Sequence, residues 1–258
     1  MSIKGRVACS FSRAASTYDA YAGVQADVAD ELAGRIRGIL PERILEIGCG
    51  TGSFTRKLAG MFADAEIMAI DISSEMVAEA RKKISGREGI RFEQVDGESL
   101  DCRFSGPYDL IVSSGALHWF EDLGNALVRY GDLLAPGGVV AAAVFGSGSL
   151  IELQKTLERM LGPGAGLPVG SFPGRDMLEG YLARAFSRWA IVERKYTRRY
   201  PDLLTLLKNL KNTGVAPVPG NGPVVRSWGR IKELEDQYTR RFGQIKATYQ
   251  VFFFQGRR

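Results

Sequence analysis

The residues with the clearest chemical potential lie in a glycine-rich segment, Glu46-Ile47-Gly48-Cys49-Gly50-Thr51-Gly52. The segment follows a short apolar run at 42–47 and precedes a stretch of helix-forming residues. Glycines at a strand-to-helix turn allow positive φ angles and let a ligand approach the backbone closely. Asp71 ends the next apolar run, 19 residues after Gly52. At the carboxyl edge of a parallel sheet such a carboxylate can accept hydrogen bonds from two ribose hydroxyls, so the spacing predicts a nucleoside site.

The details of this segment indicate which nucleotide it suits. A dinucleotide-binding turn has the pattern G-x-G-x-x-G, with the phosphates at the N-terminus of the following helix, whereas here the third glycine comes one residue early. The lysine of a Walker A loop is absent. Glu46 is an unfavourable neighbour for a pyrophosphate and a favourable one for an ammonium group. The pattern therefore favours a ligand with an amino group over a dinucleotide.

Composition and charge exclude several other classes of protein. His118 is the only histidine, which excludes sites built on two or more histidines. The cysteines, Cys9, Cys49 and Cys102, match neither a disulfide framework nor the spacing of metal ligands. No apolar run approaches the roughly 18 residues of a membrane span. The net charge of +5 favours an acidic partner or substrate.

Alternating strands and helices must position these residues. Through residue 145, short apolar runs alternate with segments whose apolar residues have helical spacing. This alternation predicts a parallel, doubly wound α/β sheet with right-handed crossovers. Ser73 or Ser74 is expected to cap the third helix. The predicted strands are 42–47, 66–70, 90–95, 108–113 and 139–145, and the predicted helices are 16–40, 52–60, 73–84 and 123–134, the last ending at Pro136-Gly137-Gly138.

The pattern changes after residue 146. Segments 150–186 and 201–244 are expected to be helical insertions around the last two strands, forming a lid at one edge of the site. The chain is expected to be a single domain, with an N-terminal helical cap at 1–40, a nucleoside-binding core at 41–146 and the remaining elements at 147–258. The first 18 residues contain basic but no acidic residues, a composition also typical of transit peptides. The later predictions are helices at 150–161, 176–186, 203–212 and 227–242, strands at 189–200 and 245–255, and a loop at 213–223.

The glycine-rich segment is one of several motifs in register. Asp71 follows the second strand, Asp96-Gly97-Glu98 the third, Tyr108-Asp109 opens the fourth, and Leu134-Ala135-Pro136-Gly137-Gly138 precedes the fifth. Together with E-x-G-C-G-T-G, this series resembles that of the S-adenosylmethionine (SAM)-dependent methyltransferases with a seven-stranded sheet. The resemblance implies SAM as the cofactor, and the strand order 3-2-1-4-5-7-6 with strand seven antiparallel.

The resemblance also implies roles for individual cofactor-binding residues. Glu46, Gly48 and Gly50 would hold the methionine portion of SAM, and Asp71 its ribose. Asp96 would accept a hydrogen bond from the adenine amine, although a role as a local loop cap is the alternative. The other implied residues are Gln25 and Cys49, Ile72 and Met76 against the adenine (Met76 is also a candidate core residue), Gly97 through its backbone, and Ser113 through its carbonyl to the methionine ammonium.

Segments outside this core narrow the resemblance. They are 11–19 with the following Gln25, 113–119, 200–214 and the terminal strand at 249–256. These segments are similar to those of the malonyl-acyl carrier protein O-methyltransferases of biotin synthesis, and the resemblance covers nearly the whole chain. It implies methylation of the free carboxylate of malonyl-acyl carrier protein, or of malonyl-coenzyme A. It further implies a monomeric, cytoplasmic enzyme that binds neither nucleic acid nor a membrane.

A malonyl carboxylate suits the residues present. It is ionised at neutral pH, so attack on a sulfonium methyl needs no general base. Catalysis then rests on in-line positioning and exclusion of water. Tyr18, His118 and Arg199 are the expected catalytic residues, as hydrogen-bond donors to the carboxylate; their structural alternatives are helix packing, a pocket wall and a solvated strand end. The family more often has glutamine at the position of His118, and Trp119 is expected to pack near the pocket mouth.

A basic surface is the expected docking site for the carrier protein, which the family resemblance implies to be acidic and to present a phosphopantetheine arm. Lys208 and Lys211 are three residues apart and share a helix face. Ordinary solvated helix faces would have the same composition. The candidate docking residues are Lys208, Lys211, Arg226, Arg230, Arg240 and Arg241.

Three other functions are compatible with this sequence. The core motifs also suit a methyltransferase of another small acid, such as trans-aconitate, or of a quinone-pathway carbon. The positive charge permits an RNA methyltransferase, although aromatic and basic residues are not interleaved. A protein that binds SAM without methyl transfer, such as an assembly factor, would carry the same cofactor motifs.

Overall fold

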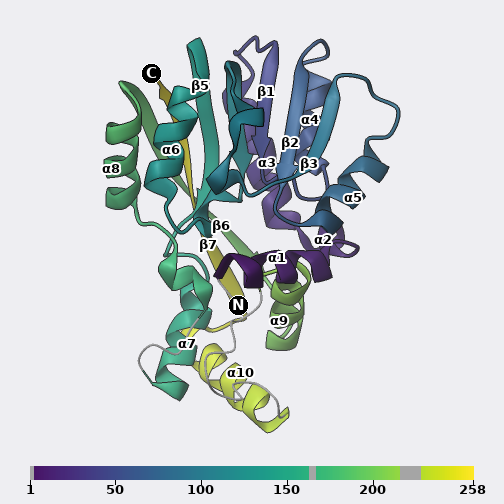
Figure 1. The fold of residues 1–258 in the computed structure, drawn as a ribbon. Coiled ribbons are helices and arrows are strands. Elements are labelled where there is room, and N and C mark those ends of the chain that lie inside the picture. Colours follow the sequence, from purple (N-terminus) through teal and green to yellow (C-terminus); the bar gives the residue numbers. More distant parts are fainter. Residues whose placement is uncertain (1–2, 163–166, 216–227) are drawn as a thin grey trace.

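The computed structural model describes residues 3–162, 167–215 and 228–258. A seven-stranded sheet forms the centre of the molecule (Figure 1). The strand order is β3-β2-β1-β4-β5-β7-β6, and only β7 runs antiparallel to its neighbours, which confirms the predicted order. The strands are β1 Arg43–Ile47, β2 Glu66–Asp71, β3 Ile90–Gln94, β4 Tyr108–Ser114, β5 Leu134–Phe145, β6 Arg188–Arg199 and β7 Lys246–Arg257.

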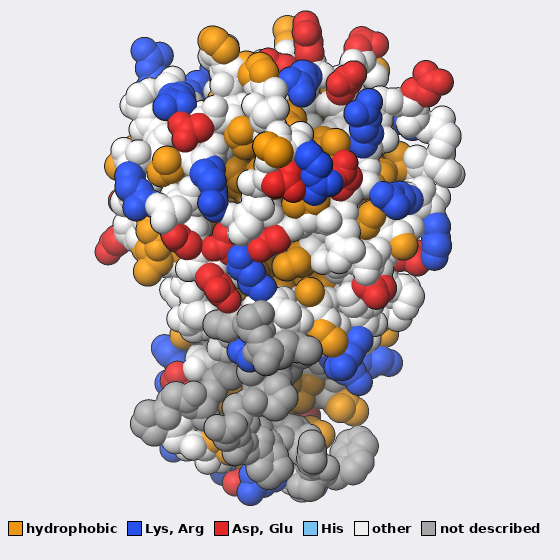
Figure 2. Space-filling view, in the orientation of Figure 1, with side chains coloured by type: hydrophobic (Ala, Val, Ile, Leu, Met, Phe, Trp, Pro, Cys, Tyr) orange, Lys and Arg blue, Asp and Glu red, His pale blue; other side chains and the backbone are white. Residues whose placement is uncertain are grey.

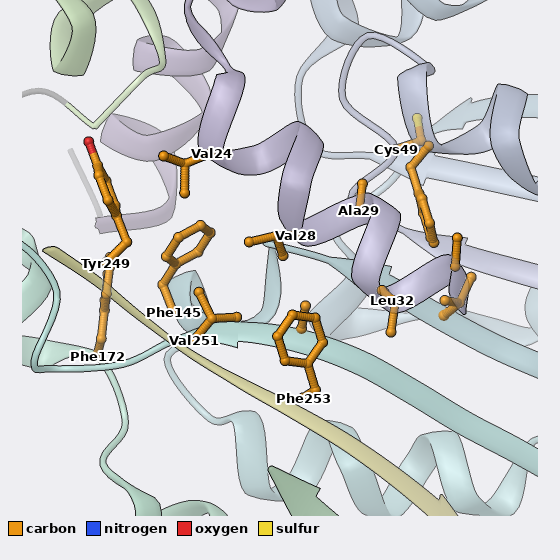
Figure 3. Packing of buried hydrophobic residues seen from close by; sticks show 14 of the residues in the cluster. Val24, Val28, Ala29, Leu32, Cys49, Phe145, Phe172, Tyr249, Val251 and Phe253 are labelled. Atoms are coloured by element: carbon orange, nitrogen blue, oxygen red, sulfur yellow. The ribbon is translucent and has the colours of Figure 1, made fainter. Parts of the chain in front are cut away.

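The central strands are apolar because both faces of the sheet are covered. One face is covered by α3 Gly23–Ile36, α4 Ser53–Met61 and α5 Ser74–Lys83, and the other by α6 Leu123–Asp132 and α8 Arg175–Ala185. Val28 and Leu32 of α3 pack against Phe145, Val251 and Phe253 of β5 and β7 (Figure 3). The visible outer face carries acidic and basic side chains interspersed over the sheet-bearing part (Figure 2).

The other helices gather at the end of the sheet where β1, β2, β3 and β4 have their carboxyl ends. In Figure 1, α1 crosses this end of the sheet, α9 lies next to it, and α7 and α10 lie further down. The order of the chain reverses between β1 and β4, and in open α/β sheets ligands bind outside the carboxyl ends of the strands at such a point. These elements are α1 Ile3–Ala14, α2 Tyr18–Tyr21, α7 Ile151–Leu161, α9 Leu203–Asn212, α10 Trp228–Phe242 and the 3-10 turns Gly97–Ser99 (η1), Cys102–Phe104 (η2), Leu117–Trp119 (η3) and Pro168–Ser171 (η4).

Most predicted elements are found within a few residues of their expected bounds. Ser73 caps α5, its hydroxyl accepting from the Met76 amide at 3.2 Å. The predicted helix 16–40 is instead two helices, separated at Ala22. Of the predicted loop 213–223, residues 216–223 lie outside the described residues, as does residue 227 of the predicted last helix. No helix in the described ranges is long and apolar enough to cross a membrane.

Two local features differ from the sequence predictions. Residues 3–14 were expected in the helical cap at 1–40 but outside its predicted helix 16–40, and they form a helix of their own, α1. The helix expected to end at Pro136-Gly137-Gly138 ends at Asp132, and these three residues belong to β5. Gly137 has φ +81°, and the register between β4 and β5 shifts between Tyr108 and Leu110. A glycine in this conformation lets the strand pass through an irregularity that proline and glycine would otherwise mark as a loop.

Candidate active site

A cavity of about 740 Å³, partly open to solvent, lies at the carboxyl ends of the central strands. Its floor comes from the turns after β1, β2, β3 and β4, and α1 and α2 supply its roof. The lining includes Lys4, Val7, Phe11, Tyr18, Gly48, Gly50, Asp71, Ile72, Met76, Asp96, Gly97, Ser114, Gly115 and Trp119. The parts predicted from separate motifs thus meet at one site.

The glycine loop presents bare backbone to the cavity. The amides of Gly48 and Cys49 both donate to the carbonyl of Ile70, at 2.8 and 2.9 Å, which ties the loop to the end of β2. Gly48 has φ +74°, and a Cβ on it would lie 2.2 Å from the Cβ of Ala116. A larger residue at Gly48 would therefore be strained and would collide with the opposite wall.

Asp71 is held rigidly at the edge of the cavity. Its Oδ2 accepts from the Gly50 amide and its Oδ1 from the Ser73 amide, both at 2.9 Å. Burial raises the pKa of Asp71, and the amide bonds from Ser73, Gly50 and Ile72 oppose that rise. Each carboxylate oxygen can accept a second hydrogen bond. The arrangement suits a vicinal diol, as predicted for a ribose.

The predicted adenine end combines polar and apolar groups. Asp96 Oδ1 accepts from the Glu98 amide at 2.9 Å, so this residue also caps the local turn. Its Oδ2 accepts from Lys4 Nζ at 2.7 Å. Met76 is 1% exposed and lines the cavity with Ile72, so it serves both as core and as cavity wall. A Cβ on Gly97 would lie 2.6 Å from Ile47 Cγ2, which leaves no room for a side chain there.

Glu46 does not line the cavity but lies behind the glycine loop. It is 1% exposed, and its Oε2 has no hydrogen-bond partner in the described part of the chain. Burial raises the pKa of Glu46 to about 8; the Thr55 hydroxyl opposes this rise and the charge of Asp71 adds to it. A buried carboxyl with an unpartnered oxygen at this position suits a cationic ligand group on the other side of the loop, such as the predicted ammonium.

Three other predicted cofactor residues lie away from the cavity lining. Ser113 is buried within β4, and its hydroxyl donates to the Ile47 carbonyl at 2.9 Å. Its neighbour Ser114 reaches the cavity instead. Cys49 packs into the core beneath the loop, and Gln25 lines a second cavity. The side chains of Cys49 and Gln25 thus lie away from this cavity. The contact predicted for Ser113 was through its backbone carbonyl and stays a prediction.

Lys4, Val7 and Phe11 of α1 are cavity residues that the sequence prediction missed. Their spacing of i, i+3 and i+7 places them on one helix face. This periodicity was the available signal, but a short helix of mixed composition is weakly specified by pattern alone. Lys4 Nζ also lies 2.9 Å from Glu98 Oε2, so it binds two carboxylates across the cavity roof.

A second cavity adjoins the first and has largely aromatic walls. The two share Phe11, Tyr18, Gly115 and Trp119. The ring of His118 lies 4.4 Å from that of Phe172, centroid to centroid, in an edge-on arrangement. With His118 neutral, none of the described residues that line the second cavity carries a formal charge. That lining further includes Gln25, Phe145, Ser149, Thr213, Val215 and Tyr249.

The polar groups of the second cavity are neutral donors. Burial lowers the pKa of His118 to about 3, so its ring is uncharged at neutral pH, and its Nδ1 has no partner in the described ranges. Burial, with the charges of Asp71 and Asp19, raises the pKa of Tyr18, whose hydroxyl therefore stays protonated. The indole Nε1 of Trp119 is likewise buried without a described partner. Such a site can hydrogen-bond an anion without transferring a proton to or from it.

Arg199 lies outside both cavities, contrary to its predicted role. It is exposed at the end of β6 and pairs in register with Lys246 of β7. The following residue, Tyr200, turns inward instead, with its hydroxyl 3.2 Å from that of Tyr249. Alternation along the strand therefore directs the arginine to solvent.

Comparisons with known proteins find similar sequences and similar folds. A family model described as a methyltransferase domain matches residues 45–140. A malonyl-[acyl-carrier protein] O-methyltransferase of Geobacter sulfurreducens is 33% identical, and the match covers 98% of each chain. Among solved structures, the YcgJ protein of Bacillus subtilis aligns with a TM-score of 0.63 at 16% identity, over 90% of this chain and 99% of its own. The [4+2]-cyclase SpnF aligns with a TM-score of 0.54 at 16% identity, over 90% of this chain and 80% of its own. At these identities, the structural matches establish the fold alone.

Proposed function

This chain belongs to the family of malonyl-[acyl-carrier protein] O-methyltransferases, and we propose that it transfers the methyl group of SAM to the free carboxylate of malonyl-acyl carrier protein. The observation that carries this proposal is the junction of two different cavities. One cavity has hydrogen-bond acceptors for the diol and the amine of a nucleoside. The other has aromatic walls and uncharged hydrogen-bond donors. They share Tyr18 and Trp119, so a ligand in each would meet there.

The first cavity fits SAM by the chemistry of its donor set. Asp71 would accept from the ribose hydroxyls, and Asp96 from the adenine amine. The bare backbone at Gly48 and Gly50 would lie against the methionine portion, with Glu46 behind it as a partner for the ammonium. When bound, SAM supplies an electrophilic methyl group on a sulfonium.

The second cavity suits the malonyl group. The carboxylate is ionised at neutral pH, so it can attack without a base. One carboxylate oxygen forms a bond to the methyl carbon as the carbon–sulfur bond breaks, giving a methyl ester and S-adenosylhomocysteine. Tyr18 and His118 would donate hydrogen bonds that orient the carboxylate, and the aromatic walls would exclude water. Because no described residue that lines this cavity is charged, the sulfonium would be the cation nearest to the carboxylate.

The remaining attributes of the proposal concern the whole protein. We propose a single-domain, monomeric enzyme in which one chain supplies the described lining of both cavities. Cys9, Cys49 and Cys102 are free thiols, which favours a reducing, cytoplasmic setting. A small aromatic cavity suits an acyl group better than a nucleic acid or a membrane lipid surface.

The first test is intact-protein mass spectrometry of malonyl-acyl carrier protein after incubation with the enzyme and SAM. We expect the mass of one CH2 group to be added to the malonyl form, and none to acetyl- or succinyl-carrier controls. SAM binding is measured in parallel by calorimetry. Binding without any mass gain would overturn the proposed methyl transfer and favour a different acceptor, or a SAM-binding protein without this chemistry.

A further inference from the structure

A third hollow borders both cavities and shares lining residues with each of them. Its outer end has the exposed residues Arg6, Glu121 and Ser171, and its inner end has the buried His118. It shares His118 and Trp119 with the second cavity. The other described lining residues are Val7, Ser10, Phe120, Pro168 and Gly214. The hollow, called the channel below, thus lies between α1 and η4 and meets the acceptor cavity at His118 and Trp119.

Helix α1 lies between this channel and the cofactor cavity, and Val7 borders both. Lys4, Val7 and Phe11 line the cofactor cavity. Arg6 and Ser10 line the channel, and Arg13 follows at the same helical spacing of i, i+4 and i+7. Arg6 and Arg13 are both exposed. The whole helix has no acidic residue, so its outer face is purely basic.

The basic residues of α10 have a different setting. Arg230, Lys232, Arg240 and Arg241 share that helix with Glu233, Glu235 and Asp236, so their charges are largely balanced. In Figure 1, α10 packs beside α7, away from α1. Arg226, another predicted docking residue, lies outside the described residues.

We propose that the outer face of α1 is the docking surface for the acidic carrier, and that its phosphopantetheine arm enters the channel between α1 and η4. The proposal rests on the proposed function, which supplies the carrier as the acceptor. Arg6 and Arg13 would face the acidic carrier surface and the phosphate of the arm. The arm would pass Ser10 and bring the malonyl group to His118 and Trp119. The negative charge of Glu121, on the opposite wall of the channel, would weaken the attraction between these arginines and the acidic carrier.

The test compares charge reversals on two helices. We expect Arg6→Glu/Arg13→Glu to raise the Kd of holo-acyl carrier protein about tenfold or more, because opposite charges across an interface become like charges. The kcat/KM of this variant for malonyl-acyl carrier protein should fall by the same factor. Its kcat/KM for the small thioester malonyl-N-acetylcysteamine should fall less than about threefold. The matched control, Arg240→Glu/Arg241→Glu, carries the same charge change on α10 and should alter neither value. The Kd is measured by fluorescence anisotropy of a labelled carrier, with S-adenosylhomocysteine present.

A second pair of variants distinguishes a loss of docking from a misfolded α1. Glu121→Lys should lower the Kd of the carrier severalfold, whereas Glu233→Lys on α10 should leave it unchanged. A gain in affinity is not the result of misfolding. Docking on α1 is overturned if the α10 variants change the Kd and the α1 and Glu121 variants do not, or if Arg6→Glu/Arg13→Glu slows both thioesters equally. A wild-type enzyme that methylates neither thioester contradicts the proposed function, while the anisotropy still reports on the docking surface.

Discussion

At the scale of single residues, Asp71 is a tightly constrained polar group of the cofactor cavity. Two backbone amides, from Gly50 and Ser73, fix its two oxygens. A fixed acceptor loses little conformational entropy when a ligand binds, which favours affinity. Its position therefore makes Asp71 a sensitive point for testing the cofactor site.

Asp71→Asn is expected to weaken SAM binding about tenfold to a hundredfold. The amide nitrogen of asparagine cannot accept a hydrogen bond, and the lost charge-assisted bond contributes about 1.5–3 kcal/mol. Calorimetric titration with SAM measures the change. Asp176→Asn, at an exposed position of α8, is the matched control and should bind as the wild type does. Wild-type affinity in Asp71→Asn would remove this residue from the ribose site.

His118 couples stability to pH because burial lowers its pKa to about 3 from an ordinary value of 6.5. In the unfolded chain it takes up a proton near pH 6.5, whereas the folded protein resists protonation until about pH 3. Its contribution to stability is thus present above pH 6.5 and is lost as pH falls toward 3. Glu46 acts in the opposite sense: its raised pKa of about 8 makes stability fall as pH rises from about 4.5 to 8.

His118→Gln should remove the first of these effects and keep the second. Between pH 7 and pH 4, the wild type should lose about 3 kcal/mol more unfolding free energy than the variant. Urea unfolding at a series of pH values measures this difference, and the contribution of Glu46 cancels because both proteins contain it. Parallel pH profiles would show that His118 is protonated normally in the folded state.

At the scale of elements, α1 is the part of the molecule that encloses the site. Lys4 ties its first turn to Asp96 and Glu98, at 2.7 and 2.9 Å. Near its last turn, the Ser12 hydroxyl lies 2.9 Å from that of Ser73 and donates to Glu75. These polar contacts attach a short helix that has little core of its own, so we expect it to open locally more readily than the sheet.

Lys4→Met/Ser12→Ala should therefore make α1 more accessible to trypsin. Loss of these bonds lowers the free energy of local opening by about 1–3 kcal/mol, which predicts roughly tenfold faster cleavage after Arg6 or Arg13. Limited proteolysis followed by mass spectrometry locates the cuts. Lys82→Met removes an exposed ion pair on α5 and is the control. Equal cleavage rates in all three proteins would mean that packing alone holds α1.

At the scale of the whole molecule, the net charge of +5 governs encounter with an acidic partner. Basic and acidic side chains are interspersed on the face seen in Figure 2, whereas α1 has basic residues only. Attraction across solvent is screened over about 8 Å at physiological ionic strength. The acceptor cavity, in contrast, holds its ligand by neutral donors that salt screens little.

Raising the salt concentration should thus slow methylation of malonyl-carrier and leave a small malonyl thioester nearly unaffected. From about 50 to 500 mM salt, kcat/KM for the carrier should fall severalfold, through slower association. Steady-state rates with both acceptors at each concentration measure this. A carrier rate that does not depend on salt would exclude electrostatic guidance of the docking.

The sequence by itself determined the sheet and the cofactor edge of the site. The strand order was implied by the resemblance to the seven-stranded methyltransferases, and apolar runs identify β1, β2 and β4 because both faces of these strands are buried. The glycine loop and Asp71 were predictable for the same reason: each lies at the end of its own strand. Parallel strands bring such ends together without help from the rest of the chain.

Only the tertiary structure decided which side chains enter the two cavities. Arg199 and Tyr200 are adjacent in sequence, but strand geometry directs the first to solvent and the second inward. Glu46 lies behind the glycine loop because it is buried in β1, a position that the local pattern does not specify. Helix α1 carries too weak a pattern to be predicted, and its place over the sheet edge comes from contacts with residues 61 to 92 positions away. Long-range packing, which no local pattern encodes, thus builds the roof of the site and its channel.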